Sequence, residues 1–214
     1  MKTTVLFDMD GVISDTQDMQ AEIESQLLKR FGINIPSKEI TRRYAGVRTS
    51  EFFKDLLDKK KVVYDIDKLM EEKRKKVITN IKKELKEIPG SVELIKKLYK
   101  DGYKLAVASA TNRLQVETNL KKLKVRKYFS VVVTGDDVKH GKPNPESYLL
   151  AAKKLHSKSS ECIVIEDGIN GMQAGKNAKM FVIGLVPKGS KLKYPADLLV
   201  NTHKETMKLD LRKL

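Results

Sequence analysis

Two carboxylates follow a short apolar run near the start of the chain. The segment TTVLFDMDGVISDT, residues 3–16, puts Asp8 and Asp10 directly after residues that favour a buried strand. Side chains two positions apart in an extended chain point the same way, so we expect both carboxylates on one side. One could attack phosphorus and become an aspartyl-phosphate, while the other protonates the leaving oxygen and then activates water.

Further polar residues stand at the ends of three later apolar runs. They are Ser109, Ala110, Thr111 and Asn112 after 103–109, Lys142 beyond 129–135, and Glu166 and Asp167 at the end of 162–167. The oxygens of Asp8, Glu166 and Asp167 suit Mg²⁺. Lys142 could balance their charge and hold a phosphate oxygen, and Ser109 could bind a phosphoryl group. Each residue alone could be a helix cap or turn residue, but their occurrence together favours one reaction centre.

The elements that would position these residues follow an alternating order. Strands are predicted at 3–7, 103–109, 129–135, 162–167, 180–186 and 197–200. Helices are predicted at 18–32, 50–60 with Ser50 as N-cap, 65–85, 92–102, 112–125, 145–155 and 170–178. Apolar strands that alternate with helices are typical of an α/β fold with a parallel sheet covered on both faces.

The helical stretch after the first strand predicts two domains. We expect residues 1–15 and 86–214 to form the catalytic core and residues 16–85 to form an inserted helical cap. In open parallel sheets, ligands bind beyond the carboxyl ends of the strands. The cap would therefore lie over the ligand site.

Four motifs resemble those of the haloacid dehalogenase superfamily, in particular its β-phosphoglucomutase-like and phosphoglycolate phosphatase-like branch. They are DMDGVISDT (8–16), VASATN (107–112), GKPNPE (141–146) and VIEDGING (164–171), and they occur in the family's order. The resemblance implies a Rossmann-like core with a helical cap, a dependence on Mg²⁺ and an aspartyl-phosphate intermediate. Thr16 resembles the hinge residue between core and cap.

The resemblance also implies individual roles. Asp8 would be the nucleophile, Asp10 the general acid and base, and Lys142 the catalytic cation. The metal would be held by the Asp8 side chain, the Asp10 carbonyl and Asp167, with Glu166 close by. The set expected to bind phosphate or substrate in the core is Gly11, Ser109, Ala110, Thr111 and Asn112.

The cap is where the resemblance is weaker. The segment YAGVRTSEFF (44–53) resembles the cap loop that reaches the active site, so Gly46, Arg48 and Lys73 are candidate substrate contacts. In sugar-phosphate mutases of the family, an arginine follows a Gly-Val pair after one intervening residue, whereas Arg48 follows it directly. Those mutases also carry a histidine where this chain has Gln20. Arg48 could instead be a surface or hinge-loop residue, and Lys73 a solvated helix lysine.

These departures favour hydrolysis, because a mutase must exclude water and hold a second phosphate. The predicted function is a Mg²⁺-dependent phosphatase of small phosphate monoesters, such as sugar phosphates or phosphoglycolate. The enzymatic alternative is β-phosphoglucomutase. A basic nucleic-acid-associated or regulatory protein without turnover is a third hypothesis, but the complete set of Asp8, Asp10, Lys142 and Asp167 argues against it.

Composition limits the possible partners and the compartment. The 214 residues include 43 Lys and Arg against 28 Asp and Glu, and the excess is spread along the chain. The absence of Trp and of basic–aromatic interleaving argues against nucleic acid as a partner. No apolar run approaches the ~20 residues that span a bilayer, no signal peptide is expected, and Cys162 is the one cysteine. We expect a cytoplasmic monomer or weak dimer that acts on a small phosphorylated metabolite.

Overall fold

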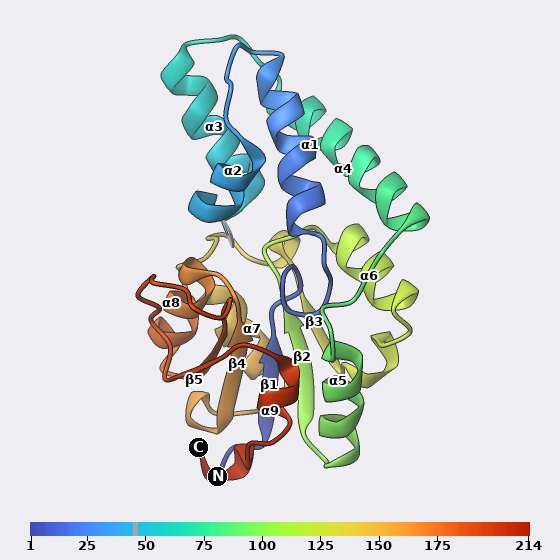
Figure 1. Ribbon diagram of the computed structural model, residues 1–214, viewed down its shortest axis with the longest axis vertical. Helices are drawn as coiled ribbons and strands as arrows, with labels where there is room; N and C mark the ends of the chain where they lie inside the picture. The colour runs from blue at the N-terminus through green and yellow to red at the C-terminus, as the bar shows by residue number, and fades with distance from the viewer. Residues whose placement is uncertain (45–46) are drawn as a thin grey trace.

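The computed structural model describes residues 1–44 and 47–214 (Figure 1). Its centre is a parallel sheet, ordered β3-β2-β1-β4-β5-β6 within the described residues. The strands are β1 Thr4–Phe7, β2 Lys104–Ala108, β3 Val131–Val133, β4 Cys162–Glu166, β5 Phe181–Leu185 and β6 Leu198–Val200. At the end of β1, Phe7 is in register with Val107 of β2 and Ile165 of β4. The residues that follow these three strands therefore meet at one edge of the sheet, which we call the carboxyl edge.

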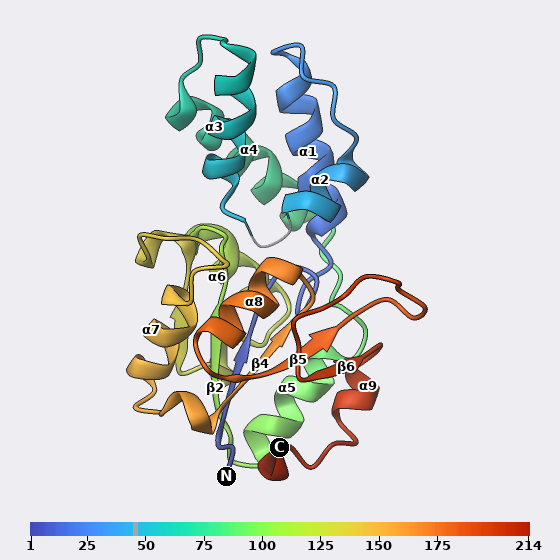
Figure 2. The same ribbon diagram turned by 90° about the vertical axis from the view of Figure 1, so that its left-hand side faces the viewer.

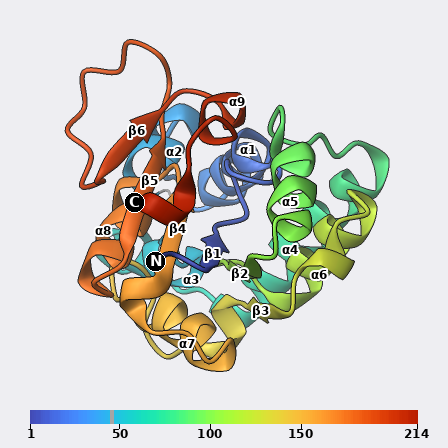
Figure 3. The same cartoon turned by 90° about the horizontal axis from the view of Figure 1, so that it is seen from below.

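Helices cover both faces of this sheet. They are α5 Ser91–Lys100, α6 Arg113–Lys122, α7 Glu146–Lys154, α8 Ile169–Asn177 and α9 His203–Thr206, with 3₁₀ turns at Arg126–Tyr128, Gly135–Asp137, Ser159–Glu161 and Leu211–Lys213. Successive side chains of β1 point to opposite faces of the sheet. Phe7 packs in the buried cluster that includes Leu94 of α5, and Leu6 packs in the cluster that includes Tyr148 of α7. Figure 3 shows α5, α6 and α9 on one side of the sheet and α7 and α8 on the other.

Four further helices stand beyond the carboxyl edge, as Figures 1 and 2 show. They are α1 Gln17–Lys29, α2 Ser37–Tyr44, α3 Thr49–Lys60 and α4 Ile66–Lys83. They share a buried cluster of their own, which includes Leu27, Phe53 and Val77. We call these helices the cap and the remainder the core. Among the described residues, none of the helices is long and apolar enough to cross a membrane.

Two short segments join the cap to the core, and they run side by side. Asp15 N–H donates to the Lys86 carbonyl at 3.0 Å, and Ile88 N–H donates to the Ile13 carbonyl at 3.0 Å. Ser14 also forms an isolated antiparallel bridge with Glu87. The predicted domain boundaries, after residues 15 and 85, fall within or next to these two connecting segments. The division into two domains stays a prediction.

Most elements agree with the sequence prediction, and the α/β fold class is confirmed. Two helices, α2 and α9, were not predicted. The α2 segment buries Ile40 alone among its residues, so it carries no apolar period that would reveal a helix. The prediction of Ser50 as an N-cap is wrong, because α3 begins at Thr49 with Arg48 in the N-cap position and no side-chain cap.

Candidate active site

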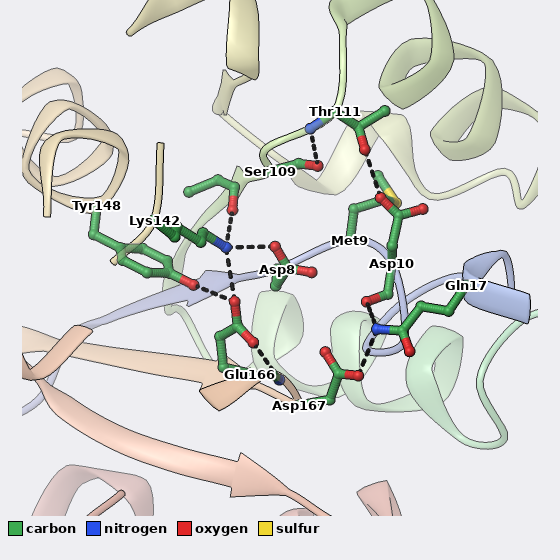
Figure 4. A network of polar contacts seen from close by, with 12 residues as sticks. Asp8, Met9, Asp10, Gln17, Ser109, Thr111, Lys142, Tyr148, Glu166 and Asp167 are labelled. Carbon is green, nitrogen blue, oxygen red and sulfur yellow. Dashed lines mark hydrogen bonds and ion pairs between the residues drawn. The ribbon is translucent and has the colours of Figure 1, made fainter. Parts of the chain in front are cut away.

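A buried lysine joins three strands at the carboxyl edge (Figure 4). Lys142 Nζ donates to Asp8 Oδ1 at 2.5 Å, to Glu166 Oε1 at 2.8 Å and to the Ala108 carbonyl at 3.2 Å. The lysine side chain is 1% exposed. Burial by itself would lower the pKa of Lys142, but the Asp8 and Glu166 carboxylates outweigh it and hold that pKa well above its usual value. Lys142 is therefore a fixed cation at the end of β1.

The second oxygen of Glu166 and the ring of Tyr148 complete this arrangement. Gly168 N–H donates to Glu166 Oε2 at 2.8 Å, and Tyr148 Oη donates to Glu166 Oε1 at 3.1 Å. Lys142 Nζ also lies 4.7 Å from the centre of the Tyr148 ring, within cation–π range. Both Glu166 oxygens thus accept hydrogen bonds from the protein, so Glu166 positions Lys142 and the turn after β4.

Negative charge exceeds positive charge at this edge. Burial raises the pKa of Asp8 to about 7; Lys142 opposes that rise, and the Glu166 and Asp10 charges add to it. Burial, followed by the charges of Glu166 and Asp8, holds the pKa of Asp167 well above its usual range. A site whose clustered carboxylates carry more negative charge than Lys142 can balance fits a bound cation.

The donor atoms agree with this electrostatic argument. Ligand oxygens of Asp8, Glu166 and Asp167 lie within 4.8 Å of one another. Carboxylate and carbonyl oxygens are the ligands that Mg²⁺ prefers in proteins. The residues present therefore fit a divalent cation at the carboxyl edge.

Gly11 leaves the room in which the Asp167 side chain lies. Its φ of +85° is left-handed, and a Cβ at this position would overlap the side chains of Asp167 and Gln17. The Gly11 N–H donates to the Ser14 carbonyl at 2.9 Å. Gly11, predicted to contact phosphate, thus contributes space and a turn, because its N–H is engaged within its own loop.

Donors from three parts of the chain hold the Asp10 carboxylate. Thr16 Oγ1 and Gln20 Nε2 donate to Asp10 Oδ1, the latter at 2.8 Å, and Thr111 Oγ1 donates to Oδ2 at 2.7 Å. Thr16 stands at the entry to the cap, Gln20 belongs to α1, and Thr111 follows β2. The orientation of Asp10 therefore depends on the position of the cap relative to the core.

The residues predicted as phosphate contacts after β2, Ser109 to Asn112, do not all have the same role. Ser109 Oγ accepts from Thr111 N–H at 3.0 Å, and Ser109 and Ala110 line the hollow above Asp8. Asn112 is the N-cap of α6, where its Oδ1 accepts from Gln115 N–H at 3.0 Å. The side chain of Asn112 is thus a helix cap in this structure, as one interpretation of the sequence had it.

Arg48 crosses from the cap to the core. Its Nη2 donates to the carbonyls of Gly135 at 3.0 Å and Val138 at 2.7 Å, and its Nη1 donates to the Lys139 carbonyl at 3.3 Å. Glu51 lies 3.8 Å from the same guanidinium. The guanidinium therefore binds backbone of the core, which the sequence did not suggest. Gly46, the other predicted contact in this loop, lies outside the described residues.

Lys73 is buried and paired inside the cap. Its Nζ lies 2.5 Å from Glu24 Oε1 and donates to Thr49 Oγ1 at 2.6 Å. Lys73 is 8% exposed and Glu24 6% exposed. The alternative interpretation of Lys73 as a solvated helix lysine is therefore wrong, because Lys73 is buried and Glu24, on the neighbouring helix α1, neutralises its charge.

A hollow connects the carboxyl edge with the cap. Asp8 and Asp10 line it on the core side, and Glu24, Thr41 and Thr49 line it on the cap side. Its volume of about 90 Å³ is several times the roughly 10–15 Å³ that one water needs. A small group bonded to a phosphate would fit between the two carboxylates and the cap.

Sequence reasoning missed several side chains of this site, among them Gln17, Glu24, Thr49 and Tyr148. Gln17 Nε2 donates to the Asp10 carbonyl at 3.0 Å and to Asp167 Oδ2 at 2.6 Å. Gln17 directly follows the first motif, and this position is the one feature of the sequence that could have indicated a role for it in the site. The others lie on helices whose relative placement no local pattern encodes.

Comparison with known proteins agrees with this fold. Residues 5–185 match the family model of the haloacid dehalogenase-like hydrolases. The chain is 34% identical to a phosphorylated carbohydrates phosphatase of Thermotoga maritima, over 81% of this chain and 80% of that protein. It is also 34% identical to the putative phosphatase YhcW of Bacillus subtilis, over 84% and 81%. The β-phosphoglucomutase structure from Clostridium difficile superposes with a TM-score of 0.86 at 27% identity, over 96% and 93%.

The class defined by this fold and these relatives is that of the phosphatases and β-phosphoglucomutase-like enzymes. The chain belongs to the haloacid dehalogenase-like hydrolase family and is an enzyme of that family. The superfamily predicted from the four motifs is therefore confirmed.

Proposed function

We propose that the chain is a Mg²⁺-dependent phosphatase that hydrolyses small phosphate monoesters through an aspartyl-phosphate. The observation that carries this proposal is the pairing of Asp8 with Lys142 at the floor of a hollow that Asp10 also lines. The relatives named as phosphatases support the same chemistry. The ligand would be a small phosphorylated metabolite.

The reaction would proceed in two displacements at phosphorus. Asp8 attacks, the ester P–O bond breaks with its electron pair on the leaving oxygen, and protonated Asp10 gives that oxygen its proton. Water then attacks the aspartyl-phosphate while Asp10 takes its proton, which releases inorganic phosphate and restores Asp8. Lys142 holds Asp8 in place and offsets its charge.

The residues proposed to hold Mg²⁺ are Asp8, Asp167 and the Asp10 carbonyl. When bound there, the ion would draw charge from the phosphoryl oxygens and reduce their repulsion with Asp8. Ser109 and Ala110 line the hollow beside Asp8, so they are the proposed core contacts of the phosphoryl group.

Hydrolysis is favoured over the mutase reaction by the charges in the cap. A mutase has to hold a second phosphate, which requires cations whose charge is available. Lys73 is paired with Glu24, and the Arg48 guanidinium binds three backbone carbonyls. Gln20, at the position of the mutase histidine, binds Asp10. The β-phosphoglucomutase reaction remains the second candidate because of the structural likeness to the Clostridium difficile enzyme.

A phosphate-release screen with Mg²⁺ tests this proposal. The panel contains sugar phosphates, phosphoglycolate and p-nitrophenyl phosphate, with β-glucose 1-phosphate plus a bisphosphate primer as the mutase arm. We expect Mg²⁺-dependent release of phosphate from at least one sugar phosphate. Conversion of glucose 1-phosphate to glucose 6-phosphate without release would favour the mutase, and turnover of no phosphate ester would contradict both.

A further inference from the structure

Two glutamines one turn apart in α1 contact different parts of the same aspartate. Gln20 Nε2 donates to the Asp10 carboxylate at 2.8 Å, whereas Gln17 Nε2 donates to the Asp10 backbone carbonyl at 3.0 Å. The same Gln17 nitrogen donates to Asp167 Oδ2 at 2.6 Å. Figure 4 shows the Gln17 amide between these two oxygens. Gln17 thus contacts two of the three groups proposed to hold Mg²⁺, and Gln20 contacts the proposed proton donor.

The chemistry of the partners decides which end of the Gln17 amide faces them. A backbone carbonyl can only accept hydrogen bonds, and so can a carboxylate that acts as a metal ligand, so the nitrogen with its two protons must point toward them. Both N–H groups are then used, one on each oxygen. The contact restrains the rotation of the Asp167 carboxylate about its own axis.

We propose that Gln17 is a positioning residue for the metal site, which orients the Asp10 carbonyl and the Asp167 carboxylate toward a divalent cation. The inference rests on the proposed function, since it takes these two groups as metal ligands. Groups that hydrogen-bond to metal ligands typically change metal affinity by about 10–100-fold when they are removed. Gln17 acts through the two ligands and does not itself bind the cation.

The location of Gln17 has a consequence for the cap. Gln17 is the first residue of α1, which is the first element of the cap, while Asp10 and Asp167 belong to the core. A change in the angle of α1 would move the amide away from both oxygens. Because coupling between two equilibria is reciprocal, cation binding should favour the cap position seen here to the same extent that this position favours cation binding.

The test is the affinity for Mg²⁺ alone, without substrate, measured by titration calorimetry. Gln17→Met keeps the length of the side chain and removes both donors, so it should weaken Mg²⁺ binding by about 10–100-fold. The Mg²⁺ concentration that gives half-maximal phosphatase activity should rise in the same proportion. Without Mg²⁺, circular dichroism and the melting temperature of Gln17→Met should stay close to those of the unmodified protein.

Two glutamines of the same helix provide matched controls. Gln20→Met removes a contact to the Asp10 carboxylate, and Gln26→Met removes an exposed contact to Glu22; both should bind Mg²⁺ within about twofold of the unmodified protein. Amide exchange of residues 17–20 should slow on addition of Mg²⁺ in the unmodified protein and not in Gln17→Met.

Three results would overturn the inference. If the unmodified protein binds Mg²⁺ and Gln17→Met binds it equally or more tightly, Gln17 does not position the metal ligands. The proposed function would then still stand. Equal weakening by Gln17→Met and Gln20→Met would show a general effect of disturbing α1. Absence of Mg²⁺ binding by the unmodified protein would overturn both this inference and the proposed metal site.

Discussion

Lys142 Nζ and Asp8 Oδ1 lie 2.5 Å apart, and the lysine side chain is 1% exposed. The two residues are 134 positions apart in the chain. Asp8 directly follows β1, and Lys142 lies in the loop between β3 and α7, so the pair depends on the assembly of the sheet. Replacing one partner would leave a buried charge without compensation, and this makes the pair a sensitive test of the site.

Lys142→Met should destabilise the protein by about 3–5 kcal/mol, the range expected when one partner of a buried ion pair is removed. The reason is that Asp8 and Glu166 would lose the cation that both contact. Urea unfolding without Mg²⁺ measures the effect, with Lys139→Met, an exposed lysine of the same loop, as control. A loss of less than about 1 kcal/mol, equal to that of the control, would contradict the account.

Asp10→Asn should affect substrates according to their leaving group. An alkyl alcohol needs a proton as it leaves, and loss of a general acid typically costs about 10²–10⁴-fold. A nitrophenolate leaves readily without one. We therefore expect kcat/KM for a sugar phosphate to fall much further than kcat/KM for p-nitrophenyl phosphate. Asp15→Asn, in the same loop but exposed, should change neither, and equal losses for the two substrates would remove Asp10 from the acid step.

Glu24→Gln should change the selectivity of the cap. The substitution removes the charge that neutralises Lys73, so the ammonium becomes available to a second anionic group of a substrate. We expect the ratio of kcat/KM for glucose 1,6-bisphosphate to that for glucose 6-phosphate to rise by about tenfold, or roughly 1.4 kcal/mol. Lys76→Met, an exposed change on α4, the helix that carries Lys73, should leave the ratio unchanged. A constant ratio in Glu24→Gln would show that the Glu24–Lys73 pair has no part in selection.

His203 should make the protein less stable in acid. Burial lowers the pKa of His203, and its Nε2 bonds to the Val12 carbonyl at 2.7 Å. A histidine with a lowered pKa in the folded state binds its proton more readily when unfolded. Stability is therefore retained above pH ~6.5 and lost as pH falls below it, by up to about 1.4 kcal/mol per pH unit. Urea unfolding at pH 8 and pH 5.5 should show a smaller acid loss in His203→Gln, and equal losses would contradict this assignment.

Local patterns were sufficient to predict the sheet and its reactive edge. Apolar runs such as that in residues 162–167 are nearly continuous and have the length of buried strands, and parallel strands place their carboxyl ends together. Asp8, Lys142 and Asp167 could therefore be assigned to one edge before their distances were known. The distances agree, since Lys142 contacts Asp8 directly.

Side-chain contacts between elements were beyond the reach of the sequence. The Arg48 guanidinium binds carbonyls of residues that lie 87 to 91 positions away. Every residue has a backbone carbonyl, so the residue type of the acceptor does not reveal such a contact. The Glu24–Lys73 pair joins α1 to α4 across the cap. Such pairs follow from helix packing, which depends on the whole set of apolar faces, and no spacing within one helix predicts them.

The most direct test of the central claim is the activity of Asp8→Asn with Mg²⁺ on p-nitrophenyl phosphate. An amide cannot replace the attacking carboxylate, and enzymes accelerate phosphate-monoester hydrolysis by up to ~10²¹-fold. The account predicts that phosphate release falls to the background of the assay while circular dichroism shows a folded protein. Substantial Mg²⁺-dependent release by the folded variant would contradict Asp8 as the nucleophile.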